Sequence, residues 1–468
     1  MMDMVRISQI TNGRQFGSNS IIRGLVNDTR KDCVDKLYVA IAGPNFDGHQ
    51  FIEKAKQNGA NGALIEQDSS FEVPAVKVGN SVEAMGQIAA AWREDFDIPV
   101  LGITGSAGKT TLKEMAGSIL SISRSGIITE GNLNNQIGVP LTLTRISSDD
   151  EFAVIEMGMS NKGEIAYLSD MVKPTVAIIN NAAPAHLDDL GSVEAVARAK
   201  GEIVEGLASD GVLIINADDQ YCSLWQSLAG SKRVITFGLN VDADISAQYV
   251  PSATGSEITV GGEYGEFSVS LNLPGEHNVR NALAVIAATL EMGCSLADVR
   301  QGLNINQSLS NRGGTHQFPE LMLVDDTYNA NPVSMLAAFD VLFLQADQFR
   351  ENDRSVKVFL VLGDMGELGQ RAEELHQDVG QAANGIADVL YCCGQFQAQY
   401  QKGFVGKTEK HVNFEAMAEA LLSDLESTIA QKIYPLVLVK GSRMSGMERV
   451  VEIIIAHEYK KNNKLGEQ

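Results

Sequence analysis

Short apolar runs that end in glycine or in a polar residue recur along this 468-residue chain. Between residues 99 and 310 the runs PVLGIT, FAVIEMG, TVAIIN, GVLIIN and RVITFG alternate with segments whose apolar positions have helical spacing. Runs of this length with no polar alternation are typical of strands in a parallel sheet that helices cover on both faces. We therefore expect a central parallel-sheet domain of the nucleotide-binding type.

The regions on either side have different patterns. Residues 1–98 carry the short runs LYVAIAG, GALIE and PAVKVG with one evident helix, FIEKAKQNGA, which predicts a small mixed α/β domain. Alternating positions between about 243 and 273 predict an antiparallel extension, and a helix starting near HNVRNALAV is expected to close the central domain. From 311 to 468, LMLVDD, VKVFLVLGD, ADVLYCCG and PLVLVKGS again alternate with helices and predict a Rossmann-like doubly wound domain. The expected fold is α/β with three domains, at residues 1–98, 99–310 and 311–468.

Composition limits the classes of partner. Apolar residues make up 44% and charged residues 21% of the chain, the balance of a soluble globular protein. The net charge of -22 would repel a nucleic-acid backbone, so we expect no nucleic-acid partner and local donors for any anionic substrate. Five cysteines, with Cys392 and Cys393 adjacent, are too few and too irregular for a disulfide framework. The N-terminus lacks a signal-peptide pattern and no apolar run approaches the roughly 18 residues that span a bilayer, so a cytoplasmic protein without membrane insertion is expected.

The stretch LGITGSAGKTTLKEM has the features of a phosphate-binding loop. A strand ending at Thr104 leads through a glycine turn into a helix, which brings backbone N–H groups and a helix N-terminus to one place. Two residues separate Gly105 from Gly108, whereas the usual P-loop has four between its glycines. Lys109 would contact the terminal phosphates and the Thr110 hydroxyl would bind Mg²⁺. The alternative is a strand-to-helix turn in which the glycines serve only the backbone geometry.

Three further residues are candidates for this site. Glu156 ends the next apolar strand, so it emerges at the same sheet edge as the phosphate loop and is suited to hold Mg²⁺. His186 also follows a strand end, so we expect it to border the same crevice, although a lone histidine often has only a structural role. Lys200 lies on a predicted helix. Its ammonium cannot bind a metal, but a carbamate formed from CO₂ and the neutral amine would, and the alternative is a solvated helix lysine.

A series of strings along nearly the whole chain resembles the Mur ligases. They are, in order, TGSAGKTT, GNLNNQIGVPLTL, IEMGMSNKGEI, NNAAPAHLDDLGS, ARAKGEI, LPGEHNVRNALA, DDTYNANPVSM, VLGDMGELG and LVKGSRMSGME. The shortened loop is that family's form of the P-loop, which implies an ATP whose γ-phosphate is passed to a carboxylate so that an amide can form. DDTYNANPVSM with VLGDMGELG is similar to the member that joins D-alanyl-D-alanine to UDP-N-acetylmuramoyl-tripeptide, and the Asp-Asn-Pro-Arg string of the diaminopimelate-adding relative is absent.

The resemblance also implies roles for individual residues. The implied catalytic residues are Lys109, Lys200 and His186. The implied ATP-binding residues are Gly105, Ser106, Ala107, Gly108, Lys109, Thr110, Thr111, Asn278, Asn281, Arg312 and Asp326. The implied substrate-binding residues are Thr29, Asn45, Asp47, Asn134, Asn135, Tyr328, Asn329 and Asn331. The implied ligands of two Mg²⁺ ions are Thr110, Glu156, His186 and, if carbamylated, Lys200.

The resemblance further implies three domains, each with its own ligand, and we expect a monomer. Residues 1–98 would bind the UDP end of the substrate, residues 99–310 would bind ATP, and residues 311–468 would close over the ATP and bind the dipeptide. Two positions depart from the family's pattern. Thr29 stands where serine is more usual, which keeps the hydroxyl, and Arg312 lies in SNRGGTH instead of the commoner Gly-Arg setting.

Without the resemblance, several of these motifs have simpler explanations. Asparagines such as Asn132, Asn134 and Asn135 are frequent turn formers, and the stretch that holds Tyr328, Asn329 and Asn331 has the composition of a helix N-cap region. In VLGDMGELG, Asp364 and Glu367 would cap a helix, or Glu367 and Leu368 would line the dipeptide pocket.

Other functions are compatible with a short phosphate loop. Folylpolyglutamate synthase shares the fold logic and the loop, and turnover of folate with glutamate would identify it. A P-loop switch or kinase would hydrolyse or transfer phosphate without making an amide, which leaves the asparagine-rich motifs unexplained. A non-catalytic nucleotide-binding scaffold is the third alternative, for which Lys109→Ala would change only nucleotide affinity.

Overall fold

The computed structural model describes residues 1–44, 46–67, 73–305, 314–411 and 413–465. The predicted site residues Asn45 and Arg312 lie outside these ranges. The chain divides into two compact units, each described separately below. The first unit comprises Met1–Asn180, Arg198–Asp244 and Ala284–Gly302, and the second comprises Asn181–Ala197, Ile245–Leu283 and Leu303–Gln468.

The first sheet lies near the N-terminus and is mixed. Its strand order is β2-β9-β8-β5-β4, in which only the β2–β9 pair is antiparallel. The elements of this region are β1 (Met2–Asp3), α1 (Met4–Ile10), β2 (Arg14–Phe16), β3 (Ile21–Ile22), β4 (Leu25–Val26), β5 (Leu37–Val39), β6 (Ala42–Gly43), β7 (Phe46–Asp47), η1 (Gly48–Phe51), α2 (Ile52–Gln57), β8 (Gly62–Ile65), β9 (Ala75–Lys77) and α3 (Ser81–Arg93).

The expectation of a single helix in this region was incomplete. Helix α2 was predicted, but α1 and α3 were not. Helix α3 buries Ala84, Met85, Ile88 and Trp92, which have helical spacing, and the Asn80 side chain caps its N-terminus. Helix α1 has only two buried positions, so its periodicity is too short to be recognised in the sequence.

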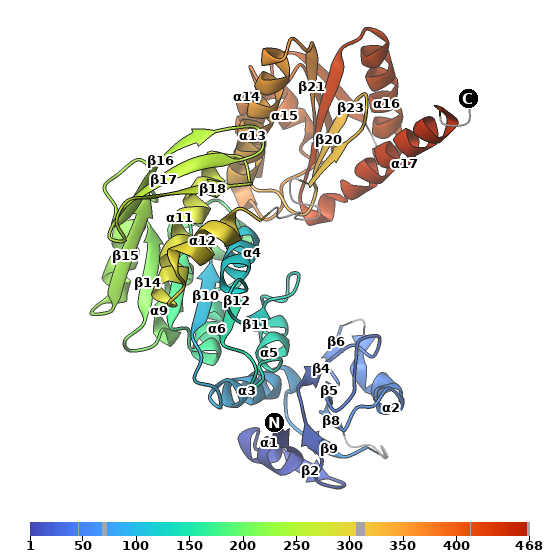
Figure 1. Cartoon of the computed structure of the whole chain (residues 1–468). Helices are drawn as coiled ribbons and strands as arrows, with labels where there is room; N and C mark the ends of the chain where they lie inside the picture. The colour runs from blue at the N-terminus through green and yellow to red at the C-terminus, as the bar shows by residue number, and fades with distance from the viewer. Residues whose placement is uncertain (45, 68–72, 306–313, 412, 466–468) are drawn as a thin grey trace. The chain divides into compact units, whose positions relative to one another are not determined.

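The second sheet carries the predicted phosphate loop. Six parallel strands are ordered β11-β12-β10-β13-β14-β15, and β10 therefore has β12 on one side and β13 on the other. Figure 1 labels β10, β11, β12, β14 and β15 of this sheet. The strands are β10 (Val100–Thr104), β11 (Gly126–Ile128), β12 (Phe152–Glu156), β13 (Val176–Ile179), β14 (Val212–Asn216) and β15 (Arg233–Gly238). β10, β12, β13 and β14 are buried at every position, as their uninterrupted apolar runs predicted.

Helices and an antiparallel extension complete this region of the sequence. The helices are α4 (Lys109–Leu120), α5 (Gly138–Leu143), α6 (Glu164–Val172), α7 (Leu187–Leu190), α8 (Val193–Gly201), α9 (Ile203–Gly206), α10 (Cys222–Ala229), α11 (Glu276–Glu291) and α12 (Leu296–Leu303). The predicted antiparallel strands are β16 (Ile245–Pro251), β17 (Ser256–Gly262) and β18 (Phe267–Leu271). Helix α11 was expected to be the last element before the third domain, but α12 follows it.

The third sheet belongs to the second unit and has the order β19-β20-β24-β21-β22-β23, with only the β19–β20 pair antiparallel. Its elements are β19 (Gly314–Gln317), β20 (Met322–Asp326), α13 (Pro332–Glu351), β21 (Val356–Leu362), η2 (Gly369–Arg371), α14 (Ala372–Ala382), β22 (Val389–Cys393), α15 (Gln397–Gly403), β23 (Lys407–His411), α16 (Phe414–Ala430), β24 (Tyr434–Lys440), η3 (Arg443–Ser445) and α17 (Glu448–Leu465).

Separate cores lie on the two faces of this sheet. One contains residues of α13, α14 and α15, and the other contains residues of α16 and α17, so the sheet is doubly wound (Figure 1). The sequence analysis missed the edge strands β19 and β23. Their sequences, GTHQ and KTEKH, are polar, and edge strands are often short and charged because one side has no partner strand.

The fold class is confirmed: a small mixed α/β region, a central parallel sheet with the phosphate loop, and a Rossmann-like C-terminal sheet follow one another along the chain. The domain boundaries after residues 98 and 310 stay predictions. Among the described residues, no helix combines the length and the apolarity that crossing a membrane requires.

Candidate active site

The turn between β10 and α4 has the conformation that a phosphate loop requires. Gly108 has a left-handed φ of 81° and is the N-cap of α4, where a side chain would be strained. The Lys109 ammonium donates to the carbonyl of Gly105 at 2.6 Å, so it folds back over the turn. Asn180, at the end of the neighbouring strand β13, donates to the carbonyl of Ala107 at 3.0 Å and holds the turn from the other side.

The remaining loop residues occupy the predicted places. Ser106 lies within the turn, and Thr110 and Thr111 lie in the first turn of α4. All three are partly exposed, whereas Gly105 is buried beneath them. Backbone N–H groups at a helix N-terminus carry partial positive charge, so this turn is suited to an anion such as phosphate, as predicted.

Glu156 lies beside this turn, as its position at a strand end predicted. Only 2% of the residue is exposed, and its two carboxylate oxygens accept hydrogen bonds from different elements. The Thr110 hydroxyl donates to Oε2 at 2.9 Å and the Asn134 amide donates to Oε1 at 2.7 Å. The backbone N–H of Glu156 donates to the hydroxyl of Thr129 at 3.0 Å. The carboxylate is therefore fixed between α4 and the loop that follows β11.

The oxygens at this point fit a magnesium ion held mainly by a nucleotide. Mg²⁺ in phosphate-transferring sites takes one or two protein oxygens and completes its shell with phosphate oxygens and water. A hydroxyl and a carboxylate oxygen meet here, on Thr110 and Glu156. The described part of the chain contains no group of three or more His, Cys, Asp or Glu side chains able to hold a metal by themselves. The donor set is thus the one that a nucleotide-bound ion uses, rather than a protein cage.

Lys200 is buried in α8, which excludes a solvated helix lysine. The residue is 2% exposed, and no hydrogen bond or salt bridge to its ammonium is found within the described ranges. Burial lowers the pKa of the Lys200 amine well below its ordinary value, and the nearby charge of Lys109 lowers it further. Burial therefore favours loss of the proton, and the unprotonated amine is the form that reacts with CO₂.

Two glycines that follow Lys200 in the sequence are sites of close packing. A Cβ atom on Gly206 would lie 2.0 Å from the carbonyl oxygen of Ser169, so α9 and α6 are in backbone contact. A Cβ atom on Gly201, next to Lys200, would lie 2.4 Å from Leu228 of α10. Close packing through glycine fixes the position of the helix that carries the lysine.

His186 belongs to the second unit, where it contacts Glu367. Nδ1 of His186 lies 2.5 Å from Oε2 of Glu367, an ion-pair distance outside the angular range of a hydrogen bond, and the N–H of Leu187 donates to the carbonyl of Glu367 at 2.9 Å. Both His186 and Glu367 have left-handed backbones, with φ of 56° and 61°. Such strained residues are concentrated at functional sites. His186 lowers the pKa of Glu367. That His186 and Glu156 border one crevice stays a prediction.

The two predicted adenine-contacting residues lie in the first turns of α11. Asn278 and Asn281 are 8% and 3% exposed, and the Asn281 amide donates to Oδ1 of Asn278 at 3.3 Å. The Asn278 amide in turn donates to the carbonyl of Pro274 at 2.8 Å. Each buried amide is therefore already oriented by a protein contact.

Asp326, at the end of β20, is paired with a buried lysine. Nζ of Lys440, which ends the neighbouring strand β24, lies 2.5 Å from Oδ2 of Asp326 and donates to the carbonyl of Asn329 at 3.0 Å. The Lys440 side chain is 2% exposed. Lys440 thus fixes both the carboxylate of Asp326 and the backbone of the predicted substrate loop.

Turn formation and helix capping, the simpler roles considered for the asparagines, are found at several of them. Asn331 is the N-cap of α13 and forms a capping box with Ser334, and Asn135 accepts from the N–H groups of Ile137 and Gly138 at the start of α5. The side chain of Asp364 accepts from the N–H groups of Gln395 and Phe396 just before α15. Tyr328 is partly exposed and Asn329 is exposed in the turn between β20 and α13, and their predicted substrate contacts stay predictions.

Two stacked phenylalanines lie in the N-terminal region, which was predicted to bind the UDP end of the substrate. The rings of Phe46 and Phe51 are 5.4 Å apart and 53% and 37% of the two residues is exposed. Together with Asp47 they line a cavity of about 460 Å³. Asp47 accepts from the backbone N–H of His49 and lies 2.7 Å from its Nδ1, which lowers the pKa of Asp47. Thr29 is partly exposed, and its carbonyl accepts from Asn58 at 2.7 Å.

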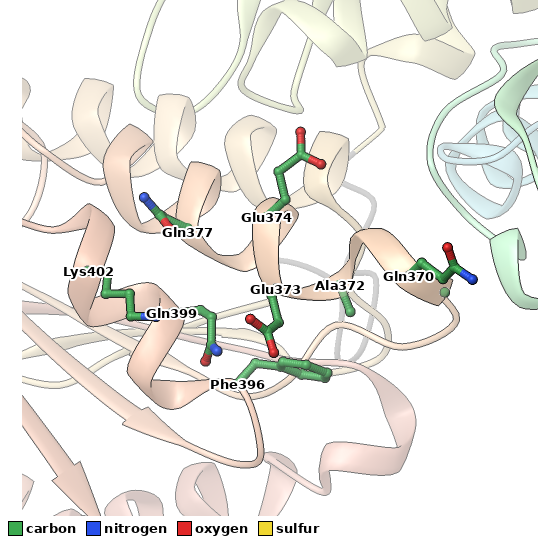
Figure 2. A pocket seen from close by; sticks show the side chains of 9 residues that line it. Gln370, Ala372, Glu373, Glu374, Gln377, Phe396, Gln399 and Lys402 are labelled. Carbon is green, nitrogen blue, oxygen red and sulfur yellow. The ribbon is translucent and has the colours of Figure 1, made fainter.

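A larger cavity, of about 520 Å³, lies elsewhere on the second unit. Figure 2 shows the Glu373 side chain pointing toward Phe396 and Gln399, while Glu374 points the other way. The full lining is Gly369, Gln370, Ala372, Glu373, Glu374, Gln377, Phe396, Gln399 and Lys402. The predicted site residues are not among these, and neither are Glu367 and Leu368, so the proposed dipeptide pocket was not found at this cavity.

Sequence reasoning missed three buried polar residues that support the site. Lys113 of α4 is fully buried, Lys440 is described above, and His376 of α14 accepts from the N–H of Met365 at 2.9 Å. A lysine or histidine inside an otherwise apolar helix face is the only signal that the sequence gives for such roles, and by itself that signal does not separate burial from exposure.

Comparisons with known proteins agree with this geometry. Residues 103–289 match the family model described as Mur ligase middle domain, and residues 314–443 match the model described as Mur ligase, glutamate ligase domain. The chain is 38% identical over 461 residues to the UDP-N-acetylmuramoyl-tripeptide--D-alanyl-D-alanine ligase of Escherichia coli strain K12. That alignment covers 97% of this chain and 99% of the relative.

Solved structures give the same result. A crystal structure of MurF from Acinetobacter baumannii superposes with a TM-score of 0.87 at 33% identity, covering 96% of this chain and 97% of that one. The MurF ligase of Thermotoga maritima in complex with ADP superposes with a TM-score of 0.79 at 26% identity, covering 94% of this chain and 98% of that one. On the evidence of both family models and of a full-length relative at this identity, the chain belongs to the Mur ligase family.

Proposed function

We propose that this chain is an ATP-dependent, ADP-forming ligase that joins D-alanyl-D-alanine to UDP-N-acetylmuramoyl-tripeptide. The products are ADP, phosphate and the UDP-muramoyl-pentapeptide used in cell-wall synthesis. One observation carries the proposal: a shortened phosphate loop lies against a buried carboxylate, with Thr110 and Asn134 holding the two oxygens of Glu156. The relatives named above support the choice of substrates.

The first step is transfer of a phosphoryl group to a carboxylate. An oxygen of the tripeptide's free carboxylate attacks the γ-phosphorus of ATP, the bond to the β-phosphate oxygen breaks, and ADP leaves with that electron pair. Because two anions must approach each other, the protein's contribution is positioning and neutralisation of charge. Lys109 and the N–H groups of the loop provide positive charge at the phosphates.

Thr110 and Glu156 are the residues that would hold Mg²⁺ in this step. The ion supplies charge neutralisation between the β- and γ-phosphates when it is bound. The Thr110 hydroxyl now donates to Glu156, and both oxygens already face each other at 2.9 Å. Asn134 keeps the second oxygen of the carboxylate oriented, so little rearrangement of Glu156 is required.

Lys200 fits a carbamate better than a free amine. Its neutral amine nitrogen attacks CO₂, a C–N bond forms, and one proton is released, leaving a carbamate with a negative charge. This converts a buried group without a partner into an oxygen ligand for a second Mg²⁺. His186 would be the other protein ligand of that ion. The His186 imidazole would first have to leave its contact with the Glu367 carboxylate.

The second step forms the amide. The amine of D-alanyl-D-alanine, in its neutral form, attacks the carbonyl carbon of the acyl phosphate and gives a tetrahedral adduct. Phosphate then leaves and the nitrogen loses a proton. Water would hydrolyse the acyl phosphate, so exclusion of water is required while it exists. We assign this task to residues 311–468, which also bind the dipeptide with Tyr328, Asn329 and Asn331.

The other ligand contacts are proposed in the same way. Residues 1–98 bind the UDP end of the substrate, for which the exposed Phe46–Phe51 pair offers aromatic surface to a base. Residues 99–310 bind ATP, with the buried amides of Asn278 and Asn281 at the adenine.

We place the reaction in the cytoplasm and expect a monomer. All five cysteines are free, and four of them are buried, which is compatible with a reducing compartment.

The test is to mix the purified protein with ATP, Mg²⁺, UDP-N-acetylmuramoyl-tripeptide and D-alanyl-D-alanine, and to follow phosphate release and peptide products. The proposal requires release that depends on both organic substrates and a product of the combined mass. Phosphate release without an amide would indicate a P-loop switch or kinase. Amide formation with folate and glutamate alone would indicate folylpolyglutamate synthase, and either result would overturn the proposal.

A further inference from the structure

Lys113 is a buried lysine whose role is not explained by the chemistry above. It lies one helical turn after Lys109 on α4, and its side chain is completely buried. Its ammonium donates to the carbonyls of Thr129 at 2.8 Å and Gly131 at 3.3 Å, and lies 3.0 Å from the carboxylate of Glu114. A buried ammonium is costly unless it is paired and hydrogen-bonded, and here it is both.

The two carbonyls belong to the loop that orients Glu156. Thr129 accepts from the N–H of Glu156 through its hydroxyl, and its own N–H donates to Val154 of β12. Asn134, farther along the same loop, donates to Oε1 of Glu156. The loop therefore contacts Glu156 at its backbone and at its carboxylate, and Lys113 fixes the segment between these two contacts.

Helix α4 reaches the same carboxylate by two routes. Thr110 contacts Glu156 directly, whereas Lys113 acts through the loop and Asn134. If Lys113 were absent, the loop would keep its contacts with β12 but would lose two hydrogen bonds from the helix that begins at the phosphate cradle. Asn134 and Thr110 would then no longer be held at a fixed separation around one carboxylate.

We propose that Lys113 is a positioning residue for the ligase reaction, which sets the distance between the phosphate cradle and Asn134 so that Glu156 is held in the geometry used for phosphoryl transfer. The inference rests on the function proposed above. It does not place Lys113 in contact with ATP or with the substrates. A buried ion pair often contributes nothing to stability compared with an apolar residue, so retention of a lysine here agrees with a role in geometry.

The test compares three variants. Lys113→Met removes the ammonium at nearly constant volume, Lys113→Arg keeps the charge but not the compact head, and Glu114→Gln removes only the ion pair. For each variant, hydrogen–deuterium exchange of residues 129–135 is measured without ligands, together with kcat, the KM for ATP and the Mg²⁺ concentration for half-maximal rate.

The expected result for Lys113→Met is faster exchange in 129–135, a fall in kcat of about 100-fold, a higher Mg²⁺ requirement and a KM for ATP within about threefold of wild type, because displacement of a catalytic group by about 1 Å costs roughly this much. Lys113→Arg should show the same changes to a smaller extent, and Glu114→Gln should resemble wild type. If Lys113→Met does not fold, the Arg variant provides the same comparison.

The proposal is overturned if exchange and kcat are unchanged in both lysine variants, or if Glu114→Gln causes the same loss as Lys113→Met. A uniform loss that follows only the folded fraction would also overturn it. A wild-type protein without ligase activity would instead refute the proposed function. The exchange measurement would still decide whether Lys113 holds the loop.

Discussion

The Thr110 hydroxyl lies 2.9 Å from Oε2 of Glu156, so the first turn of the phosphate-loop helix and the end of strand β12 meet at a single carboxylate oxygen. Neither group is free to turn away, because the carboxylate is 2% exposed and its second oxygen accepts from Asn134. Thr110 and Glu156 are therefore the two side chains that would hold a cation at this point. Several consequences of this relationship and of its surroundings are open to measurement.

Replacement of Glu156 by glutamine should reduce kcat at least about 100-fold, since a metal clamp on transferring phosphates is worth several kcal/mol. The substitution keeps the shape of the side chain but removes its charge, so the Mg²⁺ requirement should rise and the melting temperature should change little. Phosphate release measured over a Mg²⁺ titration tests this. Glu130→Gln, on the neighbouring loop, is the control because its carboxylate pairs with Arg145 and is 62% exposed. Equal kinetics for the two variants would contradict the assigned role.

Lys200→Met should abolish ligation and yet raise thermal stability in CO₂-free buffer. The folded-state pKa of Lys200 is lowered well below its value in the unfolded chain, so the unfolded state binds more protons between the two pKa values and wild-type stability rises with pH there. The methionine variant has no titrating group at this position and therefore lacks this pH-dependent contribution to stability. Its advantage in melting temperature should therefore grow as the pH is lowered from 9 toward neutrality, and a constant or reversed difference would show that the amine is not buried in neutral form.

His376 should be important for the loop that carries Glu367. Its Nε2 accepts from the N–H of Met365, and its Nδ1 lies 2.6 Å from the carbonyl of Ala372, an arrangement that only the neutral ring with a proton on Nδ1 satisfies. His376→Phe keeps the stacking on Phe396 but leaves a buried N–H without an acceptor, so a loss of about 1–3 kcal/mol is expected from denaturant unfolding. His376→Gln offers a replacement acceptor and should lose less.

The same histidine predicts a dependence on pH. Burial lowers the pKa of His376 below the ordinary histidine value of about 6.5, so in the acid range the unfolded state binds a proton that the folded state excludes. The stability present above pH 6.5 should therefore be lost progressively as the pH falls toward the folded pKa. The free energy of unfolding of His376→Gln should depend less steeply on pH over this range than that of the wild type. Identical pH dependences for variant and wild type would exclude a contribution from His376.

Phe46→Ala should weaken binding of the UDP-substrate without affecting the chemical step. Stacking of a base on an aromatic ring is worth about 1–3 kcal/mol, so the KM for the UDP-tripeptide should rise about tenfold while kcat and the KM for ATP stay constant. Steady-state kinetics with each substrate varied in turn provide the measurement. Phe343→Ala on α13 is a matched control, because Phe343 is 39% exposed and lies in the other unit. A loss confined to kcat would argue against a base platform.

The fold could be predicted from the sequence because a buried strand is recognised from the apolar run of its own residues. All five apolar runs of the central region became parallel strands, four of them buried at every position, and Glu156 could be placed at the edge of the phosphate loop because it ends one of those runs. The polar edge strands β19 and β23 and the short helix α1 lack such a signal. They form because neighbouring elements provide hydrogen-bond partners, which no local pattern reveals.

The candidate site was predicted less completely, since its contacts join distant segments. Asn134 was assigned by resemblance, but its hydrogen bond to Glu156 depends on how one loop returns to a strand end. The pairs His186–Glu367 and Asp326–Lys440 join residues more than a hundred positions apart. The burial of Lys113 and Lys200 could not be predicted either, because long charged side chains are usually exposed at their tips and composition gives no reason to expect otherwise.

The close packing of Gly206 against Ser169 has a consequence for the growth of a cell in which Gly206 is mutated. Even alanine at position 206 would force α9 and α6 apart, and such strain is tolerated best in the cold, where unfolding is slow. A cell that carries this exchange should grow at low temperature and lyse when warmed. Substitution of Gly206 would thereby make the integrity of the cell envelope depend on temperature.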